Sequence, residues 1–478
     1  MNYSQFLNMI PEATLMAILV IAFIADFATA KQAERRWFNP LVCVLFLAQT
    51  VVSFYQSKPV EAFGGMYVTT VAVNVMKTIL AGGTLIVVIQ SKKWLSRPDT
   101  SFKEGEFYML VAATLLGMNM MMSAGHFLMF FLGLEMASVP MACLVALDKY
   151  RHNSAEAAAK FILMATFSSG VMLYGISFLY GSCGTLYFND FTLQLSMGNH
   201  PALSITGLVF FMSGLGFKIS LVPFHFWTAD SYQGAPTTVT GYLSVISKGA
   251  AAFALCALLM KVFSPLQEYW EYVLYVLIVL SITVANLFAI RQSELKRFMA
   301  FSSISQAGYI MLSTIGSSAA GATALSYYIL VYIVANLAVF TVIGVVEENN
   351  HGITEMEAYN GLYATNPKLS FLLTVALFSL AGIPPFAGMF SKFFVFMAAA
   401  KQGSFLAYFV VFVALINTVV SLYYYLLIVK AMYIKTSDRP LPEFKSDFNT
   451  KIALAICVAG IALCGVCSFF YDWISAAV

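Results

Sequence analysis

The sequence predicts an all-α polytopic membrane protein, and both its composition and the spacing of its apolar runs support this fold class. Of its 478 residues, 60% are hydrophobic and only 10% are charged, with a mean hydropathy of +0.81. A soluble domain carries about 25% charged residues. Apolar runs recur along the whole chain with short polar breaks, and a helix of about 20 such residues crosses a bilayer.

Fourteen apolar runs are predicted to cross the membrane. The first lacks a basic segment in front of it, so we expect a retained span and no cleavable signal peptide. The run at 367–400 is too long for one straight span and contains Pro384 and Pro385, so it should form two half-helices, like 202–228 around Pro223. The predicted spans are 11–30, 38–56, 67–90, 107–122, 124–147, 157–180, 202–228, 236–261, 269–289, 295–315, 322–346, 367–400, 404–434 and 450–473.

Lysine and arginine residues are distributed unevenly between the two sides. Loops that follow odd-numbered spans hold eighteen of them, and loops that follow even-numbered spans hold three. Because cytoplasmic loops carry the excess of positive charge, both termini are expected outside, with the chain in the cell inner (plasma) membrane. The net charge of +3 therefore reflects topology and predicts no nucleic-acid partner.

The two proline-broken spans are the seventh and the twelfth, and an offset of five reverses orientation in the membrane. Two inverted five-helix repeats are therefore predicted, an arrangement that transporters often use to place a site near the midplane. The predicted segments are an N-terminal three-helix segment at 1–106, a first repeat at 107–262, a second repeat at 263–434, and a loop with the last span at 435–478.

The chain is not predicted to bind a cofactor or a metal ion itself. It contains no glycine-rich nucleotide loop, iron–sulfur spacing or flavin fingerprint. Cys464 and Cys467 form a CxxC pair in the last span, but no histidine or second cysteine pair lies near them in the sequence. We expect them to be small packing residues.

Charged residues inside the predicted spans are the candidate functional residues. Glu135 lies in the fifth span, and Lys160, Lys218, Lys248 and Lys392 lie in the sixth, seventh, eighth and twelfth. A charge at the bilayer centre costs about 2.5–3.5 kcal/mol on insertion scales, so each needs a reason to be there. We expect Glu135 to face Lys218; the alternative is a protonated glutamic acid bonded to the backbone.

A buried lysine can exchange its proton near neutral pH, because burial disfavours the charged form. One charge on each successive helix suits a proton path along the membrane plane, with waters and hydroxyls bridging the gaps. The hydroxyl candidates are Thr240, Ser244, Ser247, Ser302, Ser303, Ser305 and Tyr424. The alternative for each lysine is a structural role, with its ammonium reaching the interface.

The sequence indicates the roles of three other residues less clearly. Lys160 lies nearer the cytoplasmic end of its span, and both roles stay open for it. Lys77 is mid-span with no supporting neighbour, which slightly favours structure. His225 closely follows Pro223 and is a possible relay, because neutral imidazole can pass a proton between its nitrogens; the alternative is that it caps loose carbonyls.

Four stretches resemble the antiporter-like family shared by complex I and the Mrp-type cation/proton antiporters. They read FLGLEMASVPMACLVAL, GFKISLVPFHFWTADSYQGAPTTVTGYLSVISKGAA, ELKRFMAFSSISQAGYIM and FSLAGIPPFAGMFSKFFVF. The resemblance covers spans 4–13 and implies proton translocation. It further implies Glu135 and Lys218 as a charge pair, Lys248 as the central relay and Lys392 as the exit-side residue.

Within the family, the chain resembles one particular type of membrane-arm subunit. The long antiporter-like subunit of complex I has extra C-terminal spans, whereas this chain ends at Val478. The middle subunit usually has glutamate where Lys392 stands, and both usually have histidine at the position of Gln306. Lys392 together with Gln306 resembles the remaining antiporter-like type. Without histidine at 306, a path from Lys248 to Lys392 is expected to use water and hydroxyls.

The resemblance implies a proton-pumping subunit of NADH:quinone oxidoreductase, with quinone reduction elsewhere in the complex. NADH, flavin, iron–sulfur clusters and quinone would then belong to partner subunits. Other antiporter-like subunits and membrane lipid are the expected neighbours. The alternatives are an Mrp-type antiporter subunit, a membrane subunit of a hydrogenase-type complex, and a stand-alone nutrient transporter. The last is weakest, because a single substrate pocket would not explain charges on five helices.

Overall fold

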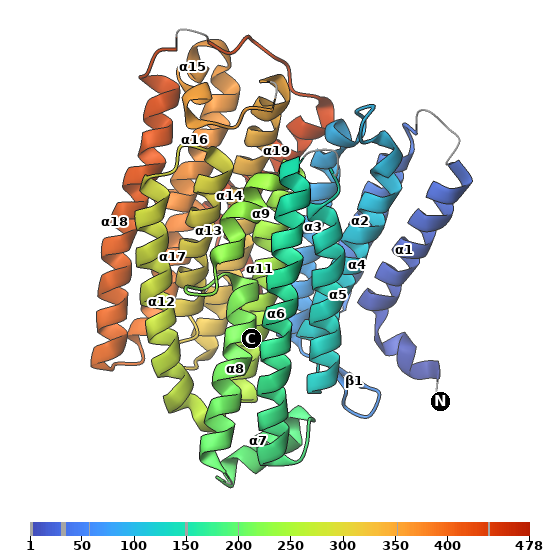
Figure 1. Cartoon of the computed structure of the whole chain (residues 1–478), viewed down its shortest axis with the longest axis vertical. Helices are drawn as coiled ribbons and strands as arrows, with labels where there is room; N and C mark the ends of the chain where they lie inside the picture. The colour runs from blue at the N-terminus through green and yellow to red at the C-terminus, as the bar shows by residue number, and fades with distance from the viewer. Residues whose placement is uncertain are drawn as a thin grey trace. The chain divides into compact units, whose positions relative to one another are not determined.

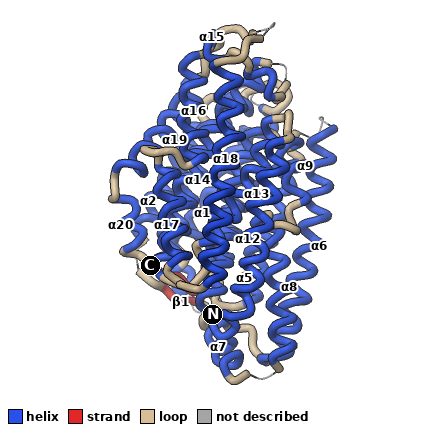
Figure 2. The backbone as a smooth tube through the Cα atoms, turned by 90° about the vertical axis from the view of Figure 1, so that its left-hand side faces the viewer, coloured by secondary structure: helices blue, strands red, loops and turns tan. Residues whose placement is uncertain are grey.

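The computed structural model describes residues 3–29, 35–56, 58–148, 152–198, 200–350, 352–437 and 440–478. Helices make up most of this part of the chain (Figure 1). Its strands form one antiparallel hairpin, β1 (Val60–Ala62) with β2 (Tyr67–Thr69) (Figure 2). The predicted basic loops include four residues outside the described ones, namely Lys31, Lys149, Arg151 and Arg439.

Twelve helical segments of the described chain are long and apolar enough to cross a membrane. They contain α1 (Ile10–Thr29), α2 (Phe38–Tyr55), α3 (Val71–Leu95), α4 (Glu104–Met122), α5 (Phe127–Val145), α6 (His152–Cys183), α8 (Pro201–Ile219), α10 (Thr237–Tyr242) with α11 (Lys248–Lys261), α12 (Gln267–Ile290), α14 (Ala319–Asn349), α18 (Phe405–Tyr433) and α19 (Phe448–Val466).

The other two predicted spans are also helical. The span at 295–315 is α13 (Leu295–Leu312), whose serines and charged residues lower its hydropathy. The run at 367–400 forms two half-helices as predicted, α16 (Pro367–Ala381) and α17 (Ala387–Ala400). The predicted fold class, an all-α polytopic membrane protein with two proline-broken helices, is confirmed.

Short helices connect or extend these spans. They are η1 (Tyr3–Asn8), η2 (Ser101–Lys103), α7 (Phe188–Ser196), α9 (Phe226–Gly234), the π-helical η3 (Leu243–Ser247), η4 (Ser264–Leu266), η5 (Met356–Tyr359), α15 (Leu362–Thr365) and α20 (Phe469–Ser475).

Both helix breaks have the same local sequence of features: a residue with positive φ, followed by proline. α8 ends before Ser220, which has φ +70°, and α16 ends before Gly382, which has φ +89°. A left-handed residue at this position terminates a helix. Proline follows in both cases, at Pro223 and at Pro384–Pro385, and cannot donate the hydrogen bond that a continuing helix needs.

The chain divides into two compact units. Unit 1 comprises Met1–Ile219, Ile246–Val273 and Ala476–Val478, and unit 2 comprises Ser220–Val245 and Leu274–Ser475. The chain passes from one unit to the other in the first helix break and again inside η3. These limits differ from the four predicted segments, whose boundaries stay a prediction, as does the inverted relation of the repeats.

In unit 1, tight helix pairs form the frame. α6 packs against α8, and α4 packs against α5 and α1; α11 packs against α8, α4 and α3 (Figure 1). α4 and α5 approach so closely that a Cβ atom at Gly117 or Gly133 would overlap the backbone of the facing helix. Small residues allow this close approach between membrane helices.

In unit 2, α14 is the central helix. It packs against α10, α13, α16, α17 and α19. Within an apolar 18-residue stretch of this helix, 89% of the residues are buried. α9 packs against α13 in the same unit. α14 therefore provides the apolar core against which the second broken helix is held.

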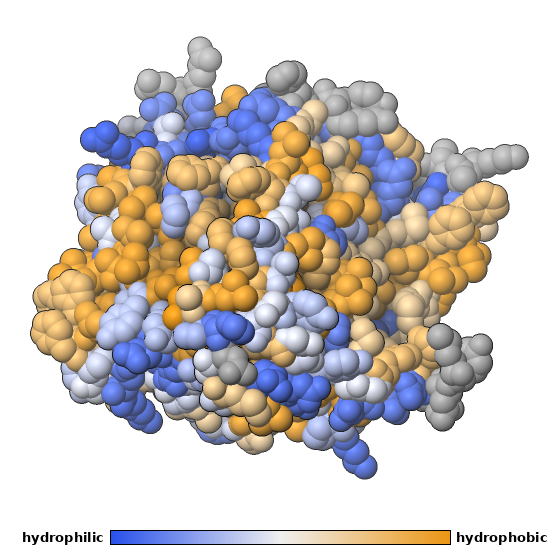
Figure 3. Space-filling view, turned by 60° about the horizontal axis from the view of Figure 1, so that its bottom comes forward, coloured by the Kyte–Doolittle hydropathy of each residue, from blue (hydrophilic) through white to orange (hydrophobic). Residues whose placement is uncertain are grey.

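Large apolar side chains are exposed on the lipid-facing helices. Phe405 is 82% exposed, and Phe27, Tyr55 and Val466 are similarly open. Figure 3 shows hydrophobic residues across the middle of one face and hydrophilic ones toward its margins. Such exposure is favourable in hydrocarbon and costly in water, so this is a multi-pass membrane protein.

Candidate functional site

Lys218 is the first buried lysine of the predicted proton path and lies next to the end of α8 in unit 1. Its side chain is 4% exposed, and Nζ donates a 2.8 Å hydrogen bond to Ser138 Oγ on α5. Nζ also lies 6.0 Å from the ring centre of Phe161. Glu135 stands one turn before Ser138 on α5 and interacts electrostatically with Lys218. The structure thus places the predicted pair in one site, with Ser138 as the direct contact.

The α5 helix is irregular just beyond Glu135. Pro140 lies inside it and has no N–H to donate to the carbonyl of Met136. That carbonyl, next to Glu135 in the chain, is thereby left without its helical partner. The sequence therefore puts a carboxylate next to a carbonyl that lacks the usual helical N–H donor four residues on.

Lys248 is the first residue of α11 and is 2% exposed. It directly follows the π-helical segment η3, and such segments inside α-helices often occur at functional sites. The preceding Ser247 hydroxyl is buried and has no hydrogen-bond partner among the described residues. α11 packs against α8, the helix that carries Lys218, so unit 1 holds both lysines on adjacent helices.

Lys392 lies on α17 in unit 2, beside the second helix break. Its Nζ donates a 3.0 Å hydrogen bond to the carbonyl oxygen of Ala381, the last residue of α16. The last carbonyls of a helix lack helical partners and attract cations, so the break itself creates this binding position. Nζ also lies 5.1 Å from the ring centre of Tyr309.

A glycine allows α17 to return closely along α16. A Cβ atom at Gly388 would overlap the carbonyl oxygen of Ser379. Glycine is therefore required for the two half-helices to pack as they do. This packing sets the position of Lys392 against the end of α16.

Gln306 occupies the centre of a polar network in unit 2. Its Nε2 donates to Leu380 O at 3.2 Å and to Tyr425 Oη at 3.3 Å, and the Tyr328 hydroxyl donates to its Oε1. The hydroxyls of Ser302 and Tyr425 are also hydrogen-bonded to each other. The Gln306 amide of α13 thus joins side chains of α14 and α18 and the backbone of α16.

Other predicted hydroxyls have different partners. Tyr424 donates to Asn286 Oδ1 at 3.0 Å, and Ser244 Oγ accepts from Asn336 at 2.7 Å. Ser303 bonds the Tyr232 hydroxyl at 3.1 Å. Thr240 instead donates to the backbone oxygen of Tyr232 at 3.0 Å, which is a structural role.

Lys160 and His225 are placed differently from Lys218, Lys248 and Lys392. Lys160 has a 46% exposed side chain and pairs with Glu156 at 2.7 Å along the surface of α6. His225 is buried at the start of α9, and its ring stacks on Phe226 at 4.7 Å. The exposure of Lys160 favours the structural role that was left open for it.

Lys77 has a partner that its sequence neighbourhood did not reveal. Its Nζ lies 2.6 Å from Glu12 Oε1, and both side chains are almost fully buried. Tyr67 donates to Glu12 Oε2 at 2.8 Å and accepts from Lys77 at 3.1 Å. The expectation that nothing supports Lys77 is therefore wrong. Glu12 was missed because it lies at the edge of the first apolar run, on a different helix.

Potential metal ligands do not gather in the described part of the chain, which contains no group of three or more His, Cys, Asp or Glu side chains suited to a metal ion. Cys464 is buried and Cys467 is exposed, so the two residues of the CxxC pair face different surroundings. The buried lysines and their hydroxyl and carbonyl partners are the groups that can hold and exchange protons.

Residues 124–419, which include the three buried lysines of the candidate path, match the family described as NADH:quinone oxidoreductase/Mrp antiporter, TM. The chain belongs to this family. A relative from Phocaeicola vulgatus named NADH-quinone oxidoreductase subunit N is 57% identical over 476 residues, covering 99% of each protein. The subunit type predicted from Lys392 and Gln306 agrees with that name.

Solved structures of the family have the same fold. A chain of respiratory complex I from Thermus thermophilus matches with a TM-score of 0.81 and 30% identity, over 98% of this chain and all of that one. A chain of the Mrp complex from Dietzia sp. DQ12-45-1b matches with a TM-score of 0.82 and 20% identity, over 100% of this chain and 97% of that one. At 20% identity the likeness concerns the fold alone.

Proposed function

We propose that this chain is an antiporter-like, proton-translocating membrane-arm subunit of an NADH-quinone oxidoreductase. The observation that carries the proposal is the placement of Lys218, Lys248 and Lys392. All three are buried beside an irregularity in a helix: a hydroxyl holds the Lys218 ammonium, a carbonyl holds that of Lys392, and Lys248 directly follows the π-helical η3. NADH, flavin, iron–sulfur clusters and quinone belong to partner subunits, and this chain moves protons only.

The coupling step begins at Glu135 and Lys218. Two unit charges 4 Å apart interact by about 4 kcal/mol at an effective dielectric constant of 20. A change in the charge of Glu135 therefore changes where the Lys218 ammonium is most stable. Ser138 holds that ammonium in the present arrangement, and Glu135 on the same face of α5 offers the second position.

The proton affinity of Lys248 depends on the position of the Lys218 charge, because Lys248 lies on α11, which packs against α8. Like charges repel, so an ammonium at Lys218 that moves toward Lys248 lowers the affinity of Lys248 for its proton. The proton then leaves for waters and hydroxyl groups. Movement of the Lys218 charge back toward Glu135 restores that affinity, and Lys248 takes up the next proton.

Lys392 is the exit-side residue in this scheme. The Ala381 carbonyl stabilises its charged form, and the neighbouring network of Gln306, Tyr425 and Ser302 offers hydroxyl and amide groups for water. Lys160 and His225 have no required part in it. The excess of basic residues in the loops after odd-numbered spans supports an inner-membrane location with both termini outside.

Gentle purification of the tagged chain from native membranes tests this function. We expect hydrophilic subunits with flavin and iron–sulfur absorbance to co-purify, and NADH oxidation by the reconstituted complex to acidify one side of the vesicle. If only other small membrane subunits co-purify, without a chromophore, the proposal is contradicted and an Mrp-type antiporter takes its place.

A further inference from the structure

Glu12, Tyr67 and Lys77 form a buried ion cluster in unit 1 that the proposed relay leaves unused. Lys77 on α3 pairs with Glu12 on α1 at 2.6 Å, and both side chains are at most 1% exposed. The Tyr67 hydroxyl on β2 bridges them, accepting from Lys77 at 3.1 Å and donating to Glu12 at 2.8 Å. Burial, and then the Glu12 carboxylate, raise the pKa of Tyr67, which keeps this bridge protonated.

Stability alone gives little reason for this cluster. Removing two charges from water costs several kcal/mol each, and well-packed apolar residues in their place are often as stable or more stable. Of the surrounding positions of α3, Val75, Met76 and Ile79 are buried and apolar, whereas Asn74 and Thr78 are buried and polar. A purely structural contact here would be served equally well by apolar side chains.

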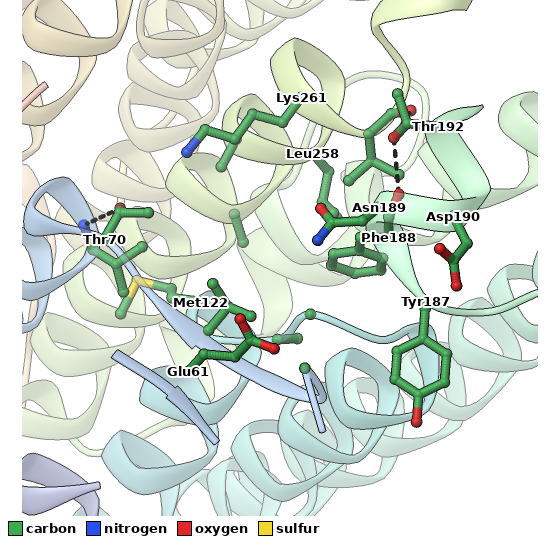
Figure 4. Close-up of a pocket in the computed structure, with 18 of the residues that line it drawn as sticks. Glu61, Thr70, Met122, Tyr187, Phe188, Asn189, Asp190, Thr192, Leu258 and Lys261 are labelled. Atoms are coloured by element: carbon green, nitrogen blue, oxygen red, sulfur yellow. Dashed lines mark hydrogen bonds between the residues drawn. The ribbon is translucent and has the colours of Figure 1, made fainter. Parts of the chain in front are cut away.

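Unit 1 also contains a cavity of about 640 Å³ (Figure 4). The exposed Glu61, Asp190 and Lys261 line it together with the buried Val73 of α3 and Ala254 of α11. With a rise of about 1.5 Å per residue, Val73 is about 6 Å along α3 from Lys77, and Ala254 is about 9 Å along α11 from Lys248. The cavity therefore lies between the helices that carry these two lysines.

Strand β2 contributes one residue to the cavity and the preceding residue to the cluster. Val68 lines the cavity, and the adjacent Tyr67 belongs to the cluster, because successive strand side chains point to opposite sides. Asn74 lies one turn before Lys77 on the same helix face, and its buried Oδ1 has no hydrogen-bond partner among the described residues. A polar atom that can accept from water thus stands next to Lys77.

All the loops around the cavity lie on one side of the membrane. They are the β1–β2 hairpin, the turn between α4 and α5, α7, and the end of α11. Each follows an even-numbered span. The cavity therefore opens on the side opposite the basic loops.

We propose that Glu12, Tyr67 and Lys77 form a second proton-exchange site, open through this cavity to the side opposite the basic loops. The inference rests on the proposed function of the chain. A proton passes from Lys77 Nζ to Glu12 Oε1, breaking an N–H bond and forming an O–H bond. The neutral acid then releases that proton to water in the cavity, and Lys77 is reprotonated from the direction of Lys248.

Variants that keep or remove the Glu12–Lys77 ion pair distinguish proton exchange at this pair from a purely structural role. Lys77→Arg keeps a charge beside Glu12 but cannot release its proton. The double variant Glu12→Leu with Lys77→Met replaces the ion pair by apolar groups. It provides a second test in case Lys77→Arg does not fold. Protons translocated per electron are measured in proteoliposomes of the assembled complex, with Lys248→Met as the reference.

We expect Lys77→Arg and the double variant to lower the proton-to-electron ratio by the same factor as Lys248→Met. A normal ratio in both, with a lowered ratio in Lys248→Met, overturns the second site and leaves the proposed function standing. A normal ratio in Lys248→Met itself contradicts the proposed function, and the inference fails with it.

Access through the cavity has its own test. Val73→Cys places a thiol at the cavity wall, and Val75→Cys places one at a buried position of the same helix outside the lining. In a chain whose native cysteines are replaced, a membrane-impermeant thiol reagent is expected to label Val73→Cys in the complex from the side opposite the basic loops only, and to leave Val75→Cys unlabelled. Labelling of neither variant, or of both equally, overturns the proposed access route.

Discussion

Lys77, Lys218 and Lys392 each have a different kind of direct partner, and the partner decides what the lysine can do. Lys77 contacts a carboxylate, Lys218 a serine hydroxyl and Lys392 a backbone carbonyl. A neutral partner satisfies the ammonium without matching its charge. Among the described residues, no carboxylate directly contacts Lys392 to accept its proton, whereas Lys77 has Glu12 in direct contact and Lys218 interacts electrostatically with Glu135.

Ser138 is predicted to act through Lys218. Ser138→Ala removes the hydroxyl that accepts from Lys218 Nζ, and an unsatisfied buried donor costs about 1–3 kcal/mol. We expect a several-fold fall in NADH-driven proton translocation in proteoliposomes. Ser138→Thr keeps the hydroxyl and should retain most of the activity. Equal translocation by Ser138→Ala and the wild type would show that this contact is dispensable.

Gln306 is predicted to hold the unit 2 network together. Gln306→Leu removes the amide that accepts from Tyr328 and donates to Tyr425, leaving buried hydroxyls without that partner at a cost of about 1–3 kcal/mol. We expect slower proton translocation at unchanged complex assembly. Gln306→His, which can both donate and accept, should be the milder variant. The prediction is wrong if the leucine and histidine variants translocate protons equally well.

At the scale of helices, much of this structure could be predicted from the sequence. Span length, proline and the left-handed positions are local properties, so the helices and both breaks were predictable. The π-helical turn before Lys248 was not, because Leu243–Ser247 carries no proline or glycine. The partners of Lys77 and Gln306 were also missed, since they lie on other helices and depend on which faces pack together.

The contact between α16 and α17 makes Gly388 sensitive to any side chain. A Cβ atom there meets the Ser379 carbonyl, and overpacking costs typically about 1–3 kcal/mol. Gly388→Ala should lower the thermal stability of the purified complex and reduce its proton translocation, because Lys392 depends on this packing. Gly170→Ala on α6, where a Cβ meets open space, is the matched control. Similar melting of the two variants would refute this explanation.

At the scale of the whole molecule, the sequence predicted fold class and span number but not the two compact units. Two of their limits fall inside the first helix break and inside η3, where the chain changes unit beside Lys218 and Lys248. Limits of this kind depend on long-range packing, which a linear reading of apolar runs does not contain. The predicted segments followed span order instead.

The whole fold does not by itself determine which ion is moved. A chain of an Mrp complex shares it at 20% identity, so ion choice depends on side chains. Lysines exchange protons, whereas hard metal cations prefer oxygen ligands. We expect NADH-driven transport by the reconstituted complex to continue without sodium and to collapse with a protonophore. Transport that requires sodium and resists the protonophore would contradict this assignment.

The proton-to-electron ratio of the assembled complex is the most direct test of the central claim that buried lysines of this chain carry translocated protons. Three forms are compared in proteoliposomes: the wild type, Lys248→Met, and Lys401→Met as a control at an exposed loop lysine. The account predicts the same ratio for the wild type and Lys401→Met and a lower ratio for Lys248→Met. The same ratio in all three forms would contradict it.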